Sequence, residues 1–170
     1  MAALNRPRGF EVKGAISRSN LYVASGAIFP GDMVIFDSGN PGQVKASAGG
    51  SAEQLLGVCL GKVQLSQASP SPVIAANDSV LVCDHPNQLY VVQAHAGQIS
   101  DLTAPLKYAE VLATAGSSQF NQSRQEITAV ATTNTLPLRI TQIDTNEYNN
   151  PADASSPVQV VVALNTPALG

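Results

Sequence analysis

Short apolar runs recur along the whole chain, and in most of them apolar and polar residues alternate. The runs are rich in valine, isoleucine and leucine, and clusters of Gly, Pro, Asn and Ser separate them. Alternation with a period of two, broken at short intervals by turn-forming residues, is typical of many short β-strands. The pattern predicts strands over residues 21–24, 32–37, 43–47, 55–65, 73–75, 79–83, 88–94, 108–114, 126–133, 138–144 and 158–164.

Two segments also have some helical character. "SAEQLL" at 51–56 resembles one capped helical turn, and "PLKYAEVLA" at 105–113 places apolar residues on one helical stripe, but each is equally compatible with a strand. In the apolar run at 55–65, Gly57 and Gly61 stand where a bulge or a close backbone approach would curl the sheet. The sequence therefore predicts an all-β fold, an antiparallel β-barrel or β-sandwich, with an extended N-terminal arm and few or no helices.

One strand-forming unit occurs twice. "PGDMVIFD" begins at Pro30, and the similar "ANDSVLVCD" begins 46 residues later. Pro30 and Gly31 suit the central positions of a type II turn, because proline fixes φ and glycine accepts the positive φ that follows. An aspartate then leads into each strand. We expect each copy to form a hairpin, the first returning through residues 43–47 and the second through residues 88–94.

The polar surface of this chain carries little charge. Charged residues make up only 12% of the 170 residues, a length that suits one domain with its own core. Residues 1–20 hold four basic residues against one acidic residue, whereas the rest of the chain holds five basic and eleven acidic residues. We therefore predict a basic N-terminal arm over residues 1–20 and a single β-rich domain over residues 21–170. Such an arm either contacts an acidic partner or stays solvated.

The apolar stretches and the cysteines indicate the cellular compartment in which the chain is made. No run has the length of a signal-peptide core or the ~20 apolar residues of a membrane span, which predicts synthesis in the cytoplasm and no membrane partner. Cys59 and Cys83 both lie in apolar strand-like runs, where a buried free thiol is favoured over a disulfide.

Histidine and cysteine offer the first candidates for chemistry. His85 follows Cys83 and Asp84, but the spacing matches no metal-ligand pattern, and His95 lies ten residues further on. Both histidines are interpreted as ordinary loop residues. The chain has no G-x-S-x-G turn, no P-loop and no G-x-G-x-x-G pattern. We therefore predict no catalytic residue, no metal, no cofactor and no enzyme activity.

Aspartates flank the strands of the repeated unit. Asp32, Asp37, Asp78 and Asp84 stand where strands begin or end, and at such positions a carboxylate commonly accepts backbone N–H groups in turns. This structural interpretation is favoured over acid–base catalysis or calcium binding. The body also lacks basic residues interleaved with aromatic ones, which argues against a nucleic-acid partner.

The stretch at 21–63, "LYVASGAIFPGDMVIFDSGNPGQVKASAGGSAEQLLGVCLGKV", resembles the head decoration, or cement, proteins of tailed bacteriophages. The resemblance rests on a "G-D-x-V" strand, a Gly-rich reversal, a "V-x-A" return strand and "L-L-G-V-x-L", with "DSVLVCD" as the second copy. It implies a virion protein without enzyme activity, assembled in the host cytoplasm, that binds the capsid surface and stabilises the shell by bridging major capsid proteins. It also implies a homo-oligomer, with a trimer favoured over a dimer. The arm residues expected to contact the capsid are Arg6, Arg8, Phe10, Lys13 and Arg18.

Other functions remain open at this point. The C-terminal half, from "QEITAVATT" onward, has no clear counterpart in the decoration proteins. The alternative function is a receptor or carbohydrate-binding module of a phage fibre or tail, although a chain with no Trp and four Tyr is poorly supplied with sugar-binding side chains. A β-rich hydrolase is the least favoured. Deleting residues 1–18 is expected to abolish capsid binding and leave the body folded.

Overall fold

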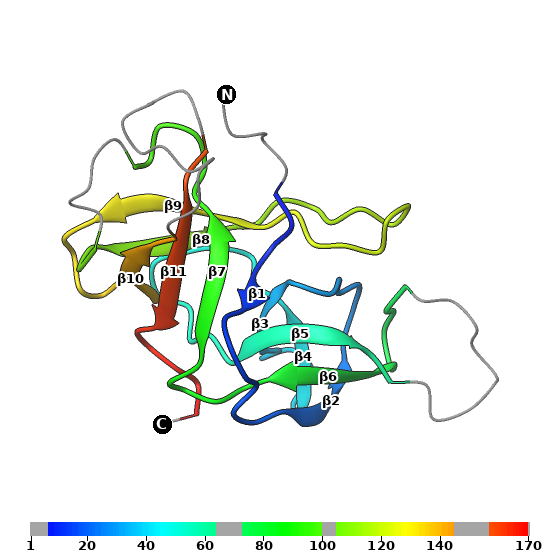
Figure 1. Ribbon diagram of the computed structural model, residues 1–170. Coiled ribbons are helices and arrows are strands. Elements are labelled where there is room, and N and C mark those ends of the chain that lie inside the picture. The colour runs from blue at the N-terminus through cyan, green and yellow to red at the C-terminus, as the bar shows by residue number, and fades with distance from the viewer. Residues whose placement is uncertain (1–6, 64–72, 100–104, 145–156, 170) are drawn as a thin grey trace.

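The computed structural model describes residues 7–63, 73–99, 105–144 and 157–169. Within these residues the chain is all-β, without helices, and its eleven strands form two sheets (Figure 1). This confirms the predicted fold class, and both segments with helical character are non-helical. The strands are β1 (Glu11–Val12), β2 (Asn20–Ala24), β3 (Met33–Phe36), β4 (Gln43–Ala46), β5 (Gly57–Lys62), β6 (Ser79–Cys83), β7 (Leu89–Gln93), β8 (Tyr108–Leu112), β9 (Glu126–Ala131), β10 (Leu138–Ile143) and β11 (Gln159–Leu164).

Most predicted strands are confirmed within a few residues, with two differences. The two-residue strand β1 was not predicted. The predicted strand at 73–75 contributes only an isolated bridge from Ile74 to Ile28. The turn-rich segments at 66–72 and 146–157 are expected from their sequences to be surface loops, but residues 66–72 and 146–156 lie outside the described residues.

Five strands close into a barrel in the order β2-β4-β3-β5-β6, with β2 and β6 paired to complete the ring. All pairs are antiparallel except β2 with β4. The barrel encloses an apolar cluster of inward-facing side chains, because alternate residues of each strand point inside. These are Ala24, Ile28, Val34, Val44, Leu56, Cys59, Ile74, Val80 and Val82.

The two copies of the repeated unit build this barrel by exchanging partners. The first copy contains β3 and is preceded by β2, and the second copy contains β6 and is preceded by β5. β2 pairs with β6, and β5 pairs with β3, so each preceding strand pairs with the strand of the other copy. The backbone hydrogen bonds repeat: Gly31 N–H donates to the Cys59 carbonyl just as Asn77 N–H donates to the Ala24 carbonyl. The barrel is therefore two interlocked halves.

The turn that opens each copy has the predicted form. Asp32 N–H donates to the Phe29 carbonyl over 2.9 Å, and Gly31 has φ of 92°. The Asp32 carboxylate also accepts the Phe29 N–H over 2.8 Å. In the second copy Asn77 takes the positive φ, at 71°, and Asp78 accepts the Ala75 N–H over 2.8 Å. The two aspartates thus stabilise the turns through backbone N–H groups, as expected.

The second copy is not a hairpin, so that prediction was wrong. β3 returns through β4 as expected, but β6 does not pair with β7. Both edges of β6 are already occupied, by β2 and β5, and β7 therefore has no free edge to join. The chain turns at His85–Gln88 and enters the other sheet.

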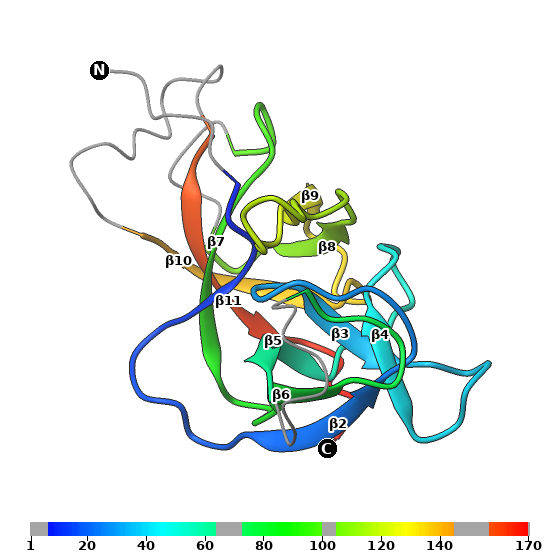
Figure 2. The same cartoon turned by 90° about the vertical axis from the view of Figure 1, so that its right-hand side faces the viewer.

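The second sheet has six strands in the order β1-β7-β11-β10-β8-β9. It curls strongly, so that β7 and β11 run across β8, β9 and β10 in Figure 1 and the barrel lies below in Figure 2. A parallel bridge between Ala94 and Ile127 brings the end of β7 to β9, near the opposite edge of the sheet. The sheet is thus almost closed on itself.

The main apolar core lies where the curled sheet covers one side of the barrel. Barrel residues that point outward on this side, such as Met33, Val58 and Cys83, join Tyr90, Val92 and other residues of the sheet. The two cysteines are free and buried in different clusters, Cys59 inside the barrel and Cys83 in this core.

The two glycines of β5 act as predicted. The β5–β6 register shifts between Cys59 and Gly61, which marks a bulge. A Cβ at Gly57 would overlap the carbonyl oxygen of Cys83, so the two strands approach more closely there than any other residue permits.

Candidate interaction surfaces

One side of the barrel is not covered by the six-stranded sheet, and β2 lies on that side (Figure 1). Tyr22 and Ala24 point inward, so Leu21 and Val23 point outward, where they are 54% and 37% exposed. Leu81 of β6 is paired directly opposite Leu21 and also points away from the barrel interior. We call Leu21, Val23 and Leu81 the barrel face. Adjoining exposed apolar residues of this kind mark contact surfaces more often than isolated ones do.

A second apolar surface is an open groove with a volume of about 420 Å³. Its floor and walls come from β1, β5 and the loop between β8 and β9, which reaches past β1 in Figure 1. The rim carries one residue of each charge, Arg8 and Glu11. The apolar lining comprises Phe10, Val12, Ile16, Leu60 and Phe120, among others. The groove and the barrel face share no residue.

Phe120 stands at the turn of the β8–β9 loop and is 72% exposed. Ser117 and Gln122 are bridged on either side of this turn, and Asn121 has a positive φ of 46°. The base of the loop is anchored by Ser123 N–H, which donates to the Pro30 carbonyl over 3.0 Å. The aromatic ring is therefore presented on a hairpin whose base is held against the turn of the first repeat.

Residues 13–19, here called the strap, connect β1 to β2 and hold Ile16 beside the groove. Ser17 N–H donates to Gln88 Oε1 over 3.0 Å, and Gln88 Nε2 donates to the Lys13 carbonyl over 3.2 Å. Lys13 Nζ also donates to Asp144 Oδ1 over 2.8 Å. Ile16 itself is 49% exposed. The strap is thus fixed at both ends, with an apolar side chain outward between them.

The end of the strap is held by a buried carboxylate, Asp84, whose side chain is fully excluded from solvent. Its Oδ1 accepts Arg18 Nε over 2.9 Å. Its Oδ2 accepts Asn20 Nδ2 over 2.7 Å and the Tyr22 hydroxyl over 2.6 Å. Arg18 also donates to the Asp84 main-chain oxygen over 2.7 Å. Asp84 was expected, like the other aspartates of the repeat, to accept backbone N–H groups of a local turn. Instead its carboxylate accepts hydrogen bonds from side chains of the strap and of β2.

This arrangement shifts the pKa of both acidic groups at the centre. Burial alone would raise the pKa of Asp84, but the hydrogen bonds from Asn20, Tyr22 and Arg18 and the guanidinium charge outweigh burial, and the pKa is lowered. Burial, together with the hydrogen bond to Asp84 and its charge, raises the pKa of Tyr22 to about 12. At neutral pH the Asp84 carboxylate is therefore ionised and the Tyr22 phenol is neutral. The role of this group of side chains is to hold the end of the strap against the barrel.

The residues that the sequence singled out in the arm are dispersed. Arg6 lies outside the described residues. Arg8 is exposed on the groove rim. Phe10 is 1% exposed and belongs to the main core, so its expected role as a surface contact is corrected: its side chain has almost no area left for a partner. Lys13 and Arg18 are engaged in ion pairs with Asp144 and Asp84.

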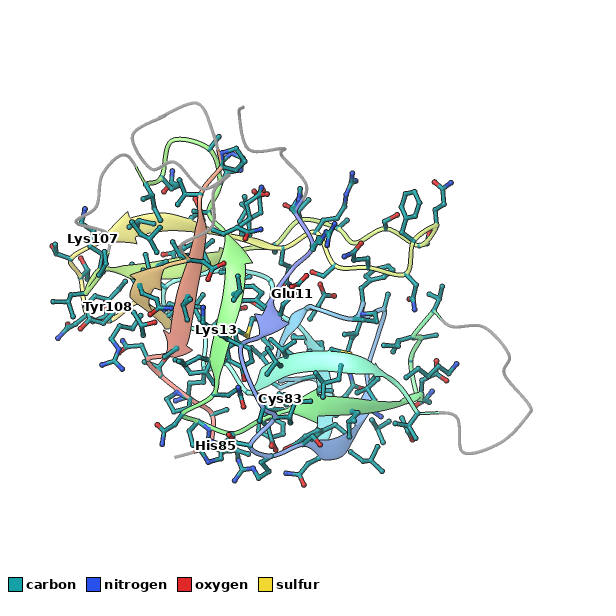
Figure 3. All side chains as sticks on the ribbon, in the orientation of Figure 1. Glu11, Lys13, Cys83, His85, Lys107 and Tyr108 are labelled. Carbon is teal, nitrogen blue, oxygen red and sulfur yellow. The ribbon has the colours of Figure 1, made fainter. Side chains whose placement is uncertain are left out.

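Sequence reasoning missed most of the groove. Figure 3 shows the Glu11 label on the side of β1 away from β7 and the Lys13 label beside β7. Phe120 had a local signal, since it is a lone aromatic residue in the polar stretch "SSQFNQS". Ile16 and Leu60 had none, because only the fold brings the strap and β5 together.

Among the described residues, the other titratable side chains with notable surroundings are the pair His95 and Glu126 and the thiol of Cys59. His95 Nδ1 lies 3.2 Å from Glu126 Oε2, and Gln93 donates to the other oxygen of that carboxylate over 2.6 Å. Burial raises the pKa of Cys59, which borders the groove, to about 12, so a thiolate nucleophile is not available there at neutral pH. Across the described ranges no cluster of three or more His, Cys, Asp or Glu could hold a metal ion.

Comparison of the chain with protein-family models, with curated proteins and with solved structures finds no match. In the part of the chain that the structure describes, there is no helix of the length and apolarity needed to span a bilayer. The function is therefore inferred from the barrel face, the groove and the residues that hold them in place.

Proposed function

We propose that this chain is a structural protein of a tailed-bacteriophage virion that binds the outer surface of the capsid and bridges neighbouring major capsid proteins. Two features support the proposal: the resemblance of residues 21–63 to head decoration proteins, and an all-β body whose surface carries few charges. The chain would act by covering and joining its neighbours.

The observation that carries the proposal is the pair of apolar surfaces that share no residue. A bridging protein needs at least two contact surfaces, one for the shell and one for a neighbour. The barrel face suits the shell contact, because Leu21 and Val23 project side by side from a strand that the six-stranded sheet does not cover. We therefore assign shell binding to Leu21, Val23 and Leu81.

The magnitudes fit a protein that binds as many copies on a lattice. Burying the exposed half of a leucine such as Leu21 contributes about 1 kcal/mol, so one barrel face alone binds weakly. Affinity does not follow from area alone, but several weak contacts made at once raise the effective concentration of each. Occupancy of the shell would then depend on more than one contact per subunit.

The test is binding of the purified protein to heads of the phage that encodes it, assembled without the protein. Saturable cosedimentation, and added density on the outer surface in micrographs of the particles, are the expected results. Leu21→Asp should reduce particle binding about tenfold or more, because a charge on the barrel face opposes burial. The matched control is Leu106→Asp, since Leu106 is 80% exposed and belongs to neither surface.

Two outcomes would reject the proposal. One is the absence of wild-type binding to the heads. The other is binding to a glycan array instead, which would favour the receptor or carbohydrate-binding alternative. Deletion of residues 1–18 is a poor test, because it removes Phe10 from the core and Arg18 from Asp84. Arg8→Glu tests a contribution of the arm without removing any core residue.

A further inference from the structure

The groove has the properties of one half of a symmetric interface between two copies of this chain. It lies between β1, β5 and the β8–β9 loop, and Phe120 on that loop is exposed while also lining the groove. The volume of about 420 Å³ lies within the range of roughly 300–1,000 Å³ found for occupied pockets. A projecting aromatic ring and a cavity that can receive one are thus part of the same surface.

Because Phe120 and the groove lie on the same surface, they favour one kind of symmetry between two copies. In a two-fold interface the same patch is used by both copies, so that residue i contacts residue j and residue j contacts residue i. A head-to-tail ring needs the projection and the cavity on different patches. Because Phe120 borders the groove that would receive the partner's ring, the arrangement favours the two-fold pair.

The charges on the rim agree with this choice. Arg8 and Glu11 are both exposed, and neither forms an ion pair with another residue of the described ranges. They stand three residues apart in sequence on the same rim, one of each sign. When a second copy approaches about a two-fold axis, the order of the two charges is reversed, and each Arg8 meets the Glu11 of the other copy. A second copy therefore supplies the complementary charges without any further residue.

The backbone of β1 adds a polar contact beside the apolar one. Glu11 is paired with Val91 and Lys13 N–H donates to the Leu89 carbonyl, so the intervening Val12 directs its own N–H and carbonyl away from β7. β1 is the last strand of its sheet, and Val12 lines the groove. An unpaired strand edge is a surface that readily accepts an extended segment.

We propose that the groove is a homodimer interface in which Phe120 of each copy inserts into the groove of the other, between Ile16 and Leu60, while Arg8 pairs with Glu11 across the axis. The inference deepens the proposed function by naming the partner at the second surface. Its argument uses the groove alone and stands whether or not the shell is that of a phage.

The test is the mass of the full-length protein in solution, measured by sedimentation velocity over a wide concentration range. The wild type is expected to be a dimer, and Phe120→Asp a monomer. Arg8→Glu and Glu11→Arg should each weaken the dimer about tenfold, because each reversal places like charges together at both symmetry-related contacts. The combined Arg8→Glu, Glu11→Arg variant should recover the wild-type dissociation constant.

The control Leu106→Asp should remain dimeric, and circular dichroism of each variant verifies that it is folded. A wild type that stays monomeric at ~100 μM, a trimer, or a double charge reversal no tighter than the single ones would overturn the inference. The two proposals fail separately: Leu21→Asp is expected to dimerise but to bind heads at least about tenfold more weakly, whereas Phe120→Asp is expected to be monomeric yet to retain weak binding through the barrel face.

Discussion

Asp84 offers the sharpest test of how the strap is held, through the substitution Asp84→Asn. Three donors converge on the two carboxylate oxygens, from Arg18, Asn20 and Tyr22. An asparagine at this position keeps one acceptor oxygen and turns the other into an NH2 group that faces donors. The substitution therefore removes the negative charge and leaves at least one buried donor without an acceptor.

The expected cost follows from these contacts. Hydrogen bonds to a charged group contribute about 1.5–3 kcal/mol each, and breaking a buried ion pair on one side costs about 3–5 kcal/mol. Because the Arg18 side chain is 41% exposed, solvent recovers part of that cost. We therefore expect Asp84→Asn to lower the free energy of unfolding by about 3 kcal/mol, which corresponds to about 6–12 °C in Tm for a chain of this size.

The assay is urea unfolding followed by circular dichroism, with Tyr22→Phe and Glu11→Gln alongside. Tyr22→Phe removes one of the three donors and should cost about 1.5 kcal/mol, the lower end of the range for a hydrogen bond to a charged group. Glu11→Gln changes an exposed carboxylate of the groove rim and should leave the stability of the monomer, measured at a protein concentration too low for dimerisation, unchanged. A loss of less than about 0.5 kcal/mol in Asp84→Asn would refute the reasoning, since desolvation of the carboxylate would then cancel its hydrogen bonds.

Three further predictions concern the same fold. Because the pKa of Asp84 is lowered in the folded chain, the carboxylate stabilises the fold above its ordinary pKa of 3.8, and this contribution is lost as the pH falls through the lower folded pKa. Unfolding curves measured between pH 2 and 5 should therefore show a flatter pH dependence in Asp84→Asn than in the wild type. Gly57→Ala should cost about 2–3 kcal/mol in urea unfolding, because a methyl group would overlap the Cys83 carbonyl, whereas Gly26→Ala, where nothing lies within 4 Å of the added atom, should be tolerated; equal stability of the two would contradict the close approach. Burial raises the pKa of the thiols of both Cys59 and Cys83, so a thiol reagent such as Ellman's should react with neither in the folded chain at pH 8 and with both in urea; a rapid reaction of either in the folded state would show that the core opens.

Local features of the fold could be predicted from the sequence, because they depend on neighbours along the chain. The alternation of apolar residues marks most strands, and the sequence Pro30-Gly31-Asp32 specifies a turn through its own φ preferences and its own carboxylate. Gly57 was recognised for the same reason, since only glycine permits a close approach in a strand.

Pairing between distant strands was beyond such reasoning. The second copy of the repeat looks like a hairpin in sequence, yet β6 is enclosed by β2 and β5, and only the closed barrel determines this. In the same way the charge of Arg18 suggested a free arm, whereas a buried carboxylate 66 residues away captures it. The groove combines β1, β5 and the β8–β9 loop, so no single stretch of sequence carries its pattern.

The exchange of partners between the two repeats has a consequence for how the protein is made. β2 is complete at residue 24, but its antiparallel partner β6 ends at residue 83, so a nascent chain emerging from the ribosome cannot close the barrel until both repeats are exposed. Contacts this distant in sequence slow folding. A product truncated or stalled before the end of β6 would therefore have no closed barrel.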